Sequence, residues 1–195
     1  MTRPLLLASL ALGAAACGQE ATPTRVETGV CDGVIATYPT IASPHREEGA
    51  AEAWTTNPPT SGPHSPAWAA WDVHHPTLDR VHWVHNLEHG GVVIAYRCDQ
   101  ACPDVVAELA TIIDETATDP SCQAPVRHRL LLVADPLLPD GVAVAAVAWG
   151  AAFTASCVDA DHLRAFIAAH YDDGPESLCA DGLPFASEPL PVPTP

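Results

Sequence analysis

The chain has 195 residues, of which 24 are acidic and only 8 are basic, giving a formal net charge of -16. Proteins that bind nucleic acid need a basic surface to meet the phosphates, so this charge excludes that class and disfavours an anionic membrane surface. Hydrophobic residues make up 48% of the chain, which is sufficient for the core of one domain.

Residues 1–16 are typical of a lipoprotein signal peptide. Arg3 supplies a positive charge, and the apolar run that follows is too short to span a membrane and ends in small residues directly before Cys17. We therefore expect export, with Cys17 lipidated and the protein anchored through it to the bacterial cell envelope, in the periplasm or on the outer surface. Ala14 stands where such signals usually carry Leu, and plain secretion with a free Cys17 is the alternative.

The next two segments contain little periodicity. Residues 17–30 are predicted to form a polar tether. Residues 31–80 are rich in Pro, Gly and small side chains, yet they carry several aromatic residues, which disordered segments lack. We therefore expect long ordered loops in the N-terminal half, and loops of this length inside a compact domain are usually functional.

Regular structure is expected to begin near Trp83. The apolar patterns predict strands at 92–96, 126–134, 142–149 and 153–157, and helices at 104–116 and 159–171. This order predicts an α+β fold, with a small, mostly antiparallel sheet and helices packed on one side. We expect one domain over residues 31–182, followed by a Pro-rich tail over 183–195.

Besides Cys17, the chain has six cysteines, and an even number in an exported chain predicts three disulfides. They are Cys31, Cys98, Cys102, Cys122, Cys157 and Cys179. Sequence alone leaves their pairing open. Cys98 and Cys102 are spaced as in some copper carriers and would bind Cu(I) as a reduced pair, but a disulfide is the preferred interpretation in an exported protein.

The candidate site is a group of histidines around the stretch WVHNLEHGG. His85 and His89 are four residues apart, so that a helix or a strand would place both on one side. His64 ends the Pro- and Gly-rich stretch NPPTSGPH, whose limited backbone freedom fixes its direction. Imidazoles that converge in this way predict a metal site.

The available ligand types narrow the metal ion. Neutral imidazole suits Cu(II) and Zn(II), whereas the soft thioether and thiolate ligands of Cu(I) are missing if the cysteines are oxidised. Glu88 and Asn86 are expected to orient the histidines rather than bind the ion. The opposing interpretation is a hydrogen-bonded loop network without a metal.

The segment His85 to His89 also fits the H-x-x-E-H pattern of inverted zinc peptidases, in which the Glu activates water. That pattern requires a helix, and Gly90 and Gly91 would end one at once, while Val81, Trp83 and Val84 are poor helix formers. Glu88 is therefore a catalytic base only if the protein is an enzyme.

Taken together, several motifs resemble the bacterial and fungal DUF3105 family, a domain of unknown function. They are NPPTSGPH, WVHNLEHGGVVIAY, the AWG at 148–150 and the GPE at 174–176, and the resemblance spans about residues 35–178. It implies that His45, in an H-x-x-x-G element, joins the other three histidines as a shared imidazole. It implies no reaction. Relatives tend to carry Gly and Tyr at His74 and His75, which are either extra ligands or, as we expect, surface residues.

The sequence thus predicts an exported lipoprotein that binds divalent copper or zinc through His45, His64, His85 and His89, for metal handling or redox chemistry in the envelope. Its expected partners are the metal ion and the membrane that holds Cys17, with no nucleic acid and no assigned protein partner. One alternative is a metal-dependent enzyme, either a zinc hydrolase or a copper oxidase. The other is a structural envelope protein without a metal.

Overall fold

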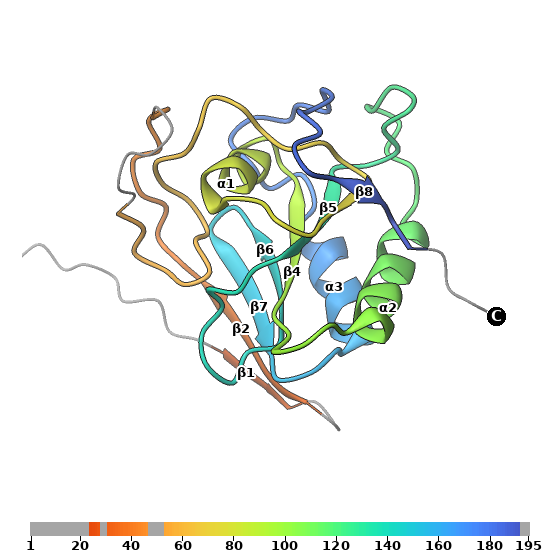
Figure 1. The fold of residues 1–195 in the computed structure, drawn as a ribbon. Helices are drawn as coiled ribbons and strands as arrows, with labels where there is room; N and C mark the ends of the chain where they lie inside the picture. Colours follow the sequence, from red (N-terminus) through yellow and green to blue (C-terminus); the bar gives the residue numbers. More distant parts are fainter. Residues whose placement is uncertain (1–23, 28–30, 47–52, 192–195) are drawn as a thin grey trace, which may run out of the picture.

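The computed structural model describes residues 24–27, 31–46 and 53–191 (Figure 1). The predicted signal peptide and Cys17 lie outside the described residues. Within the described part of the chain, no helix combines the length and apolar character needed to cross a membrane.

The described fold is an α+β sheet of eight strands with three helices, in the strand order β1-β2-β7-β6-β4-β5-β3-β8. Strand β4 pairs in parallel with β5, which pairs in parallel with β3, and the other neighbours are antiparallel. The strands are β1 Thr24–Glu27, β2 Asp32–Thr37, β3 Val73–His75, β4 Val92–Tyr96, β5 Leu130–Ala134, β6 Val144–Ala148, β7 Ala151–Ala155 and β8 Glu188–Pro189. The helices are α1 Arg80–Glu88, α2 Pro103–Asp114 and α3 Ala160–His170.

The sheet is covered on both faces, and alternate residues of its central strands serve the two layers. Val92 and Ile94 of β4 join the cluster formed with α2 and α3, whereas Val93 and Ala95 join the cluster that contains α1. Every residue of β4 is buried, as expected for a central strand covered on both faces. Figure 1 shows α2 and α3 together on one side and α1 on the other.

The four predicted strands and both predicted helices are confirmed, with ends that differ by a few residues. The expectation that regular structure begins near Trp83 is wrong, because β1, β2 and β3 all precede it. Pro103 is the first residue of α2, where its missing N–H costs nothing. The carboxylate of Asp159 accepts a hydrogen bond from the backbone N–H of His162 and so caps α3. These two helices lie on the same face of the sheet, as predicted.

Helix α1 is the main correction to the sequence analysis. It begins at Arg80, and the stretch that contains Trp83 and His85 is helical although its residues are poor helix formers. Seven of its nine residues are buried, so packing against the sheet outweighs intrinsic propensity. Since the helix has no exposed polar face, it lacks the amphipathic pattern by which helices are predicted.

Six cysteines form three disulfides, as predicted. Two of these connect distant parts of the chain, namely Cys31–Cys157 and Cys122–Cys179. The third, Cys98–Cys102, closes a short turn between β4 and α2. Cys98 and Cys102 are oxidised in this structure, so they do not offer the two thiolates that a Cu(I) site would need.

Candidate metal centre

Three imidazoles and one carboxylate converge at the outer side of α1. His85 and Glu88 lie on the helix, His64 lies on the loop that precedes β3, and His45 lies on the segment that precedes residues 47–52. Each residue offers one nitrogen or oxygen atom, and these four atoms all lie within 4.8 Å of one another. This group of four, the His/Glu cluster, can hold a metal ion.

The carboxylate oxygen Oε2 of Glu88 lies among the ring nitrogens. It is 3.0 Å from Nε2 of His64, 3.8 Å from Nε2 of His45 and 3.9 Å from Nε2 of His85. His64 and His85 are buried, while the His45 side chain is 53% exposed. The cluster is therefore set into the protein on the helix side and is reached from solvent at His45.

The orientation of the two buried rings is fixed by backbone carbonyls. Nδ1 of His64 donates to the carbonyl of Gly62 at 2.8 Å, and Nδ1 of His85 donates to the carbonyl of Ser65 at 2.7 Å. A carbonyl only accepts, so Nδ1 carries the proton in both rings. Nε2 is then the nitrogen of each ring that faces the cluster, and an Nδ1 held by a carbonyl is the arrangement that metal-binding histidines usually have.

The lowered pKa of His85 also suits a role as a metal ligand. Burial, more than the neighbouring imidazoles His89, His64 and His45, lowers the pKa of His85 to about 3. Burial is also the main cause that lowers the pKa of His89. His85 is therefore neutral at ordinary pH, and no proton has to leave it before a cation binds.

Three chain segments are held together at the cluster by backbone hydrogen bonds. The amide of Arg46 donates to the carbonyl of His64 at 2.8 Å, so that His45 and His64 form an isolated parallel bridge. The amide of Ser65 donates to the carbonyl of Val81 and fixes the loop to α1. These contacts bring His45, His64 and His85 together from three parts of the sequence.

Gly62 allows the close approach of this loop. Its φ of 119° belongs to a region that L side chains rarely adopt. A β-carbon at this position would come within about 3 Å of the side chains of Ile41 and Trp54. A glycine two residues before His64 is therefore required by both the backbone and the packing.

His89 stands beside the His/Glu cluster and is not one of its four members. It is the residue that ends α1, and its Nε2 lies 3.1 Å from Nε2 of His85. Since Nδ1 of His85 is protonated, Nε2 of His89 must be the donor in this contact. Nε2 of His89 also lies 3.4 Å from the carboxylate of Glu176, and the ring packs edge-on against Trp68.

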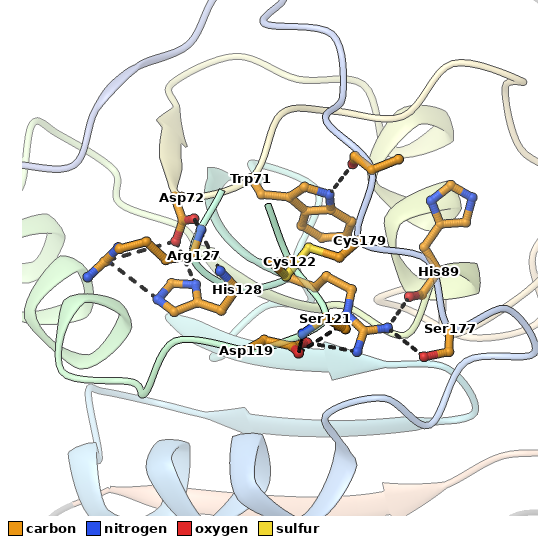
Figure 2. The surroundings of a disulfide bond; sticks show 12 residues. Trp71, Asp72, His89, Asp119, Ser121, Cys122, Arg127, His128, Ser177 and Cys179 are labelled. Carbon is orange, nitrogen blue, oxygen red and sulfur yellow. Dashed lines mark hydrogen bonds and ion pairs between the residues drawn. A yellow bond between two sulfur atoms is a disulfide. The ribbon is translucent and has the colours of Figure 1, made fainter. Parts of the chain in front are cut away.

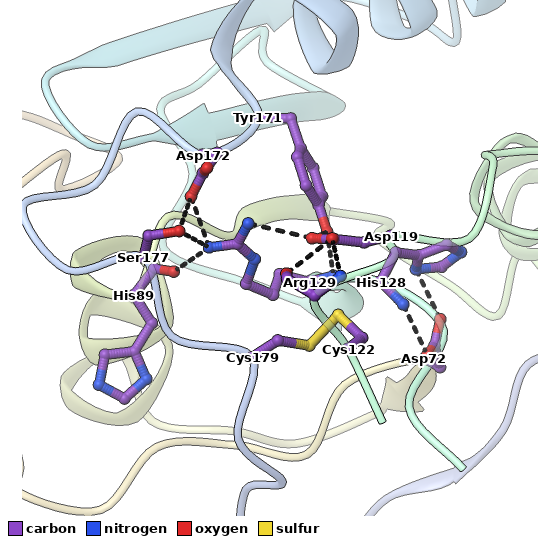
Figure 3. A network of polar contacts seen from close by, with 11 residues as sticks. Asp72, His89, Asp119, Cys122, His128, Arg129, Tyr171, Asp172, Ser177 and Cys179 are labelled. Atoms are coloured by element: carbon purple, nitrogen blue, oxygen red, sulfur yellow. Dashed lines mark hydrogen bonds and ion pairs between the residues drawn. A yellow bond between two sulfur atoms is a disulfide. The ribbon is translucent and has the colours of Figure 1, made fainter. Parts of the chain in front are cut away.

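The end of α1 is secured by a buried guanidinium. Arg129 donates to the carbonyl of His89 at 2.9 Å, to Asp172 at 2.6 Å and to Asp119 at 3.0 Å (Figure 3). Tyr171 completes the group by donating to Asp119 at 2.8 Å. Figure 3 shows the ring of His89 turned away from this network, so Arg129 holds the backbone of the site rather than its imidazole.

The segment after α3 packs directly on the same turn. The amide of Glu176 donates to the carbonyl of Glu88 at 3.0 Å, and the amide of Asp172 donates to the carbonyl of Gly90 at 2.9 Å. Gly174 lies so close to the backbone of Glu88 and Gly90 that no β-carbon fits there. The Gly-Pro-Glu motif thus has a structural role, which is to cover the end of α1.

One disulfide anchors this segment to the body of the protein. Cys122–Cys179 lies beside Trp71, whose indole N–H donates to the carbonyl of Ala180 at 2.8 Å (Figure 2). Figure 2 shows that this disulfide lies between Trp71 on one side and the polar network that contains Asp119 on the other. The disulfide therefore connects the loop between α2 and β5 to the segment that covers the end of α1.

The structure changes two expectations about individual residues. Glu88, expected as an orienter, offers its own oxygen to the cluster, and its three-residue spacing from His85 on one helix face was the available signal. The prediction that His74 and His75 lie on the surface is wrong, because they are 5% and 0% exposed. Both belong to β3, an inner strand of the sheet, and Asn86 is likewise buried, where it bonds to the backbone of Ala69.

Comparison with known proteins gives one result. No curated protein and no solved structure matches the chain. The family model described as "Protein of unknown function (DUF3105)" matches residues 45–181, a range that contains all four residues of the His/Glu cluster as well as His89. Since that range is more than half of the chain, the protein belongs to the DUF3105 family.

Proposed function

We propose that this protein binds one divalent transition metal ion, Cu(II) or Zn(II), through His45, His64, His85 and Glu88. The observation that carries the proposal is the convergence of their four donor atoms within 4.8 Å. Three imidazole nitrogens and one carboxylate oxygen form a donor set that suits both ions. The task that fits such a site in an exported protein is metal handling or redox chemistry in the cell envelope.

Two features support binding over a plain hydrogen-bonded network. The Nδ1 hydrogen bonds of His64 and His85 direct both Nε2 atoms toward one region, where the N–H of His89 that contacts Nε2 of His85 would have to give way to the ion. A carboxylate and two buried imidazoles also create a region that favours a cation, because a buried negative charge needs a positive partner. Nε2 of His64 and Oε2 of Glu88 lie 3.0 Å apart, and because Nδ1 of His64 donates to Gly62, a proton or a cation between these two atoms is needed to satisfy both.

A titration of the metal-stripped protein tests the proposal. We expect one equivalent of Zn(II) or Cu(II) to bind, and His85→Ala to lose that equivalent while circular dichroism shows a folded domain. His170→Ala is the matched control, because His170 pairs with Asp173 outside the cluster. Equal stoichiometry for the wild type and His85→Ala would refute the site. Elemental analysis of protein isolated from its native envelope would then identify the ion.

A metal-dependent hydrolase is the second candidate. It is favoured by the placement of His85 and Glu88 on one helix with His89 at its end, since H-x-x-E-H sites require this helical context. In that case the two histidines bind zinc and Glu88 acts as the base. The two functions differ in one respect: a base can be replaced by Gln without loss of the metal, whereas a ligand cannot.

Export and lipid anchoring are part of the same proposal. They are supported by the residue pattern before Cys17 and by three disulfides, which persist in oxidising compartments. Expression of Cys17→Ala in a bacterial host tests the anchor. We expect the variant to move from the membrane fraction to the soluble fraction, and an unchanged membrane fraction would contradict the lipid anchor.

A further inference from the structure

A cleft of about 750 Å³ lies away from the His/Glu cluster, at the junction of β4 and α2. The disulfide Cys98–Cys102 forms part of its wall, and His74, Tyr96 and Glu188 form another part. Cys98 is exposed and Cys102 is half-buried. The disulfide is therefore accessible to a molecule that enters the cleft.

The three disulfides differ in what they can contribute to the fold. Cys31–Cys157 and Cys122–Cys179 join residues 126 and 57 positions apart, whereas Cys98–Cys102 joins residues only 4 positions apart. A cross-link restricts the unfolded chain less when its loop is shorter. The Cys98–Cys102 bond thus has the weakest structural reason to be present, and it is also open to solvent.

The Cys98–Cys102 pair lies at a strand–helix junction of the fold. Strands β4 and β5 are parallel and α2 connects them, and the cysteine pair lies at the turn from β4 into α2. A cysteine pair beside such a strand–helix–strand unit is typical of thioredoxin-like redox proteins, although their spacing is one residue shorter. Cys102 is also the N-cap residue of α2, where the free N–H groups of the first turn stabilise a thiolate.

The cleft carries negative charge and no opposing cation. Glu188 accepts a hydrogen bond from Nδ1 of His74 at 2.7 Å, and Nε2 of His74 accepts one from the hydroxyl of Tyr96 at 2.9 Å. Asp99 is exposed next to Cys98. Among the described residues that line the cleft, none is Lys or Arg. The wall therefore favours a neutral or basic partner over an anionic one.

We propose that Cys98–Cys102 is an exchangeable disulfide that oxidises the thiols of a neutral or basic peptide seated in this cleft. A partner thiolate attacks the exposed sulfur of Cys98, a mixed disulfide forms, and the electron pair of the broken bond passes to Cys102 as a thiolate. A second partner thiolate then attacks the partner's own sulfur in the mixed disulfide. The partner leaves as a disulfide, and Cys98 and Cys102 together take up its two electrons and two protons.

The test uses the full folded protein and cysteamine as a small cationic thiol. After timed exposure, free thiols are blocked with N-ethylmaleimide, and peptide mass spectrometry measures each cysteine pair. We expect Cys98–Cys102 to be reduced about tenfold faster than the other two pairs, or more, and to reform when cystamine is added. Reduction of all three pairs at one rate, or no reduction of Cys98–Cys102, would overturn the proposal.

Two further measurements separate a redox site from a merely exposed bond. When incubated with cystamine, the Cys102→Ser variant should form a mixed disulfide between Cys98 and cysteamine and release one cysteamine thiol, and failure to do so would contradict the accessibility of the Cys98 sulfur. The anionic thiol 2-mercaptoethanesulfonate should react several-fold more slowly than cysteamine after correction for thiolate content. Equal corrected rates would contradict recognition by the acidic cleft.

Discussion

Nε2 of His64 lies 3.0 Å from Oε2 of Glu88, and the histidine of this pair is fully buried. The carboxylate comes from α1 and the imidazole from a loop 24 residues earlier. The contact therefore joins the part of the His/Glu cluster that lies on the helix to the part that lies on the loops. A metal ion bound between them would coordinate both atoms in place of their direct contact. This pair is therefore the point at which the binding and hydrolytic proposals diverge.

The substitution Glu88→Gln tests the role of the carboxylate. It keeps the length of the side chain but removes the charge and weakens the oxygen as a ligand. If Glu88 is a ligand, the affinity for Zn(II) should fall by about 10- to 100-fold or more, as for changes at metal-site residues. Isothermal titration measures this effect. An unchanged affinity would instead favour Glu88 as the base of a hydrolase.

A second prediction concerns His89, which lies next to the cluster but is not one of its four members. We expect His89→Gln to keep one metal equivalent, because the four donor atoms of the cluster come from other residues. By contrast, loss of the equivalent in His89→Gln, measured beside His85→Ala, would make His89 a direct ligand and would favour the H-x-x-E-H arrangement.

The stability of the metal-free protein should depend on pH through His85. Burial lowers its pKa from 6.5 to about 3 in the folded state. Between these values the unfolded chain binds the proton and the folded protein does not, so acid favours unfolding. The contribution of His85 is complete above pH 6.5 and is lost as the pH falls towards 3, by at most about 1.4 kcal/mol per pH unit.

Urea denaturation of the metal-free protein at several pH values between 4 and 7.5 measures this dependence. His85→Gln removes the imidazole and should give a flatter plot of unfolding free energy against pH. Gly141→Ala, which changes no titratable group, is the control and should keep the wild-type slope. The same slope in His85→Gln as in the wild type would show that His85 is not held neutral by burial.

Gly174 should be needed for both stability and metal binding. A β-carbon at this position would overlap the backbone of Glu88 and Gly90 at the end of α1. We expect Gly174→Ala to destabilise the protein by about 1–3 kcal/mol, as overpacking does, and to weaken metal binding because Glu88 shifts. Thermal unfolding and metal titration provide the two measurements.

A matched control for Gly174→Ala is Gly141→Ala. Gly141 has nothing within 4 Å of its added β-carbon, and its φ is 82°. This variant should lose only about 1 kcal/mol from backbone strain and should bind metal normally. If both variants bound metal equally well, the packing of residue 174 on α1 would not support the site.

The central strands were predictable because their sequences are locally consistent with their structure. Val92–Tyr96 is an apolar, mostly β-branched or aromatic run that follows two glycines, and the structure places β4 at those residues. The helices α2 and α3 likewise have apolar stripes and a Pro or Asp at their start. Both signals are local, so neither depends on the rest of the fold.

Helix α1 was not predictable by the same signals. Its interior positions are almost all buried, and residues such as Val81 and Trp83 have low helix propensity. Only the contact with the sheet explains why this segment is helical. The position of Glu88 follows from this helix, since three residues on a helix, unlike three on a strand, bring it to the same face as His85.

The candidate site was predictable in its residue types but not in its geometry. The spacing of His85 and His89 and the rigid loop before His64 indicated a histidine cluster. The bridge between His45 and His64, by contrast, joins two loops through backbone hydrogen bonds. Such non-local contacts depend on the whole fold, and the same is true of the pairing of Cys122 with Cys179.

X-ray absorption spectroscopy of the protein loaded with one equivalent of Zn(II) tests the central claim most directly. We predict a first shell of nitrogen and oxygen ligands at roughly 2.0–2.1 Å, with the outer-shell signal of three imidazoles, and loss of one imidazole in His64→Ala. A shell without imidazole signal, or one identical in the wild type and His64→Ala, would contradict a metal site at the His/Glu cluster.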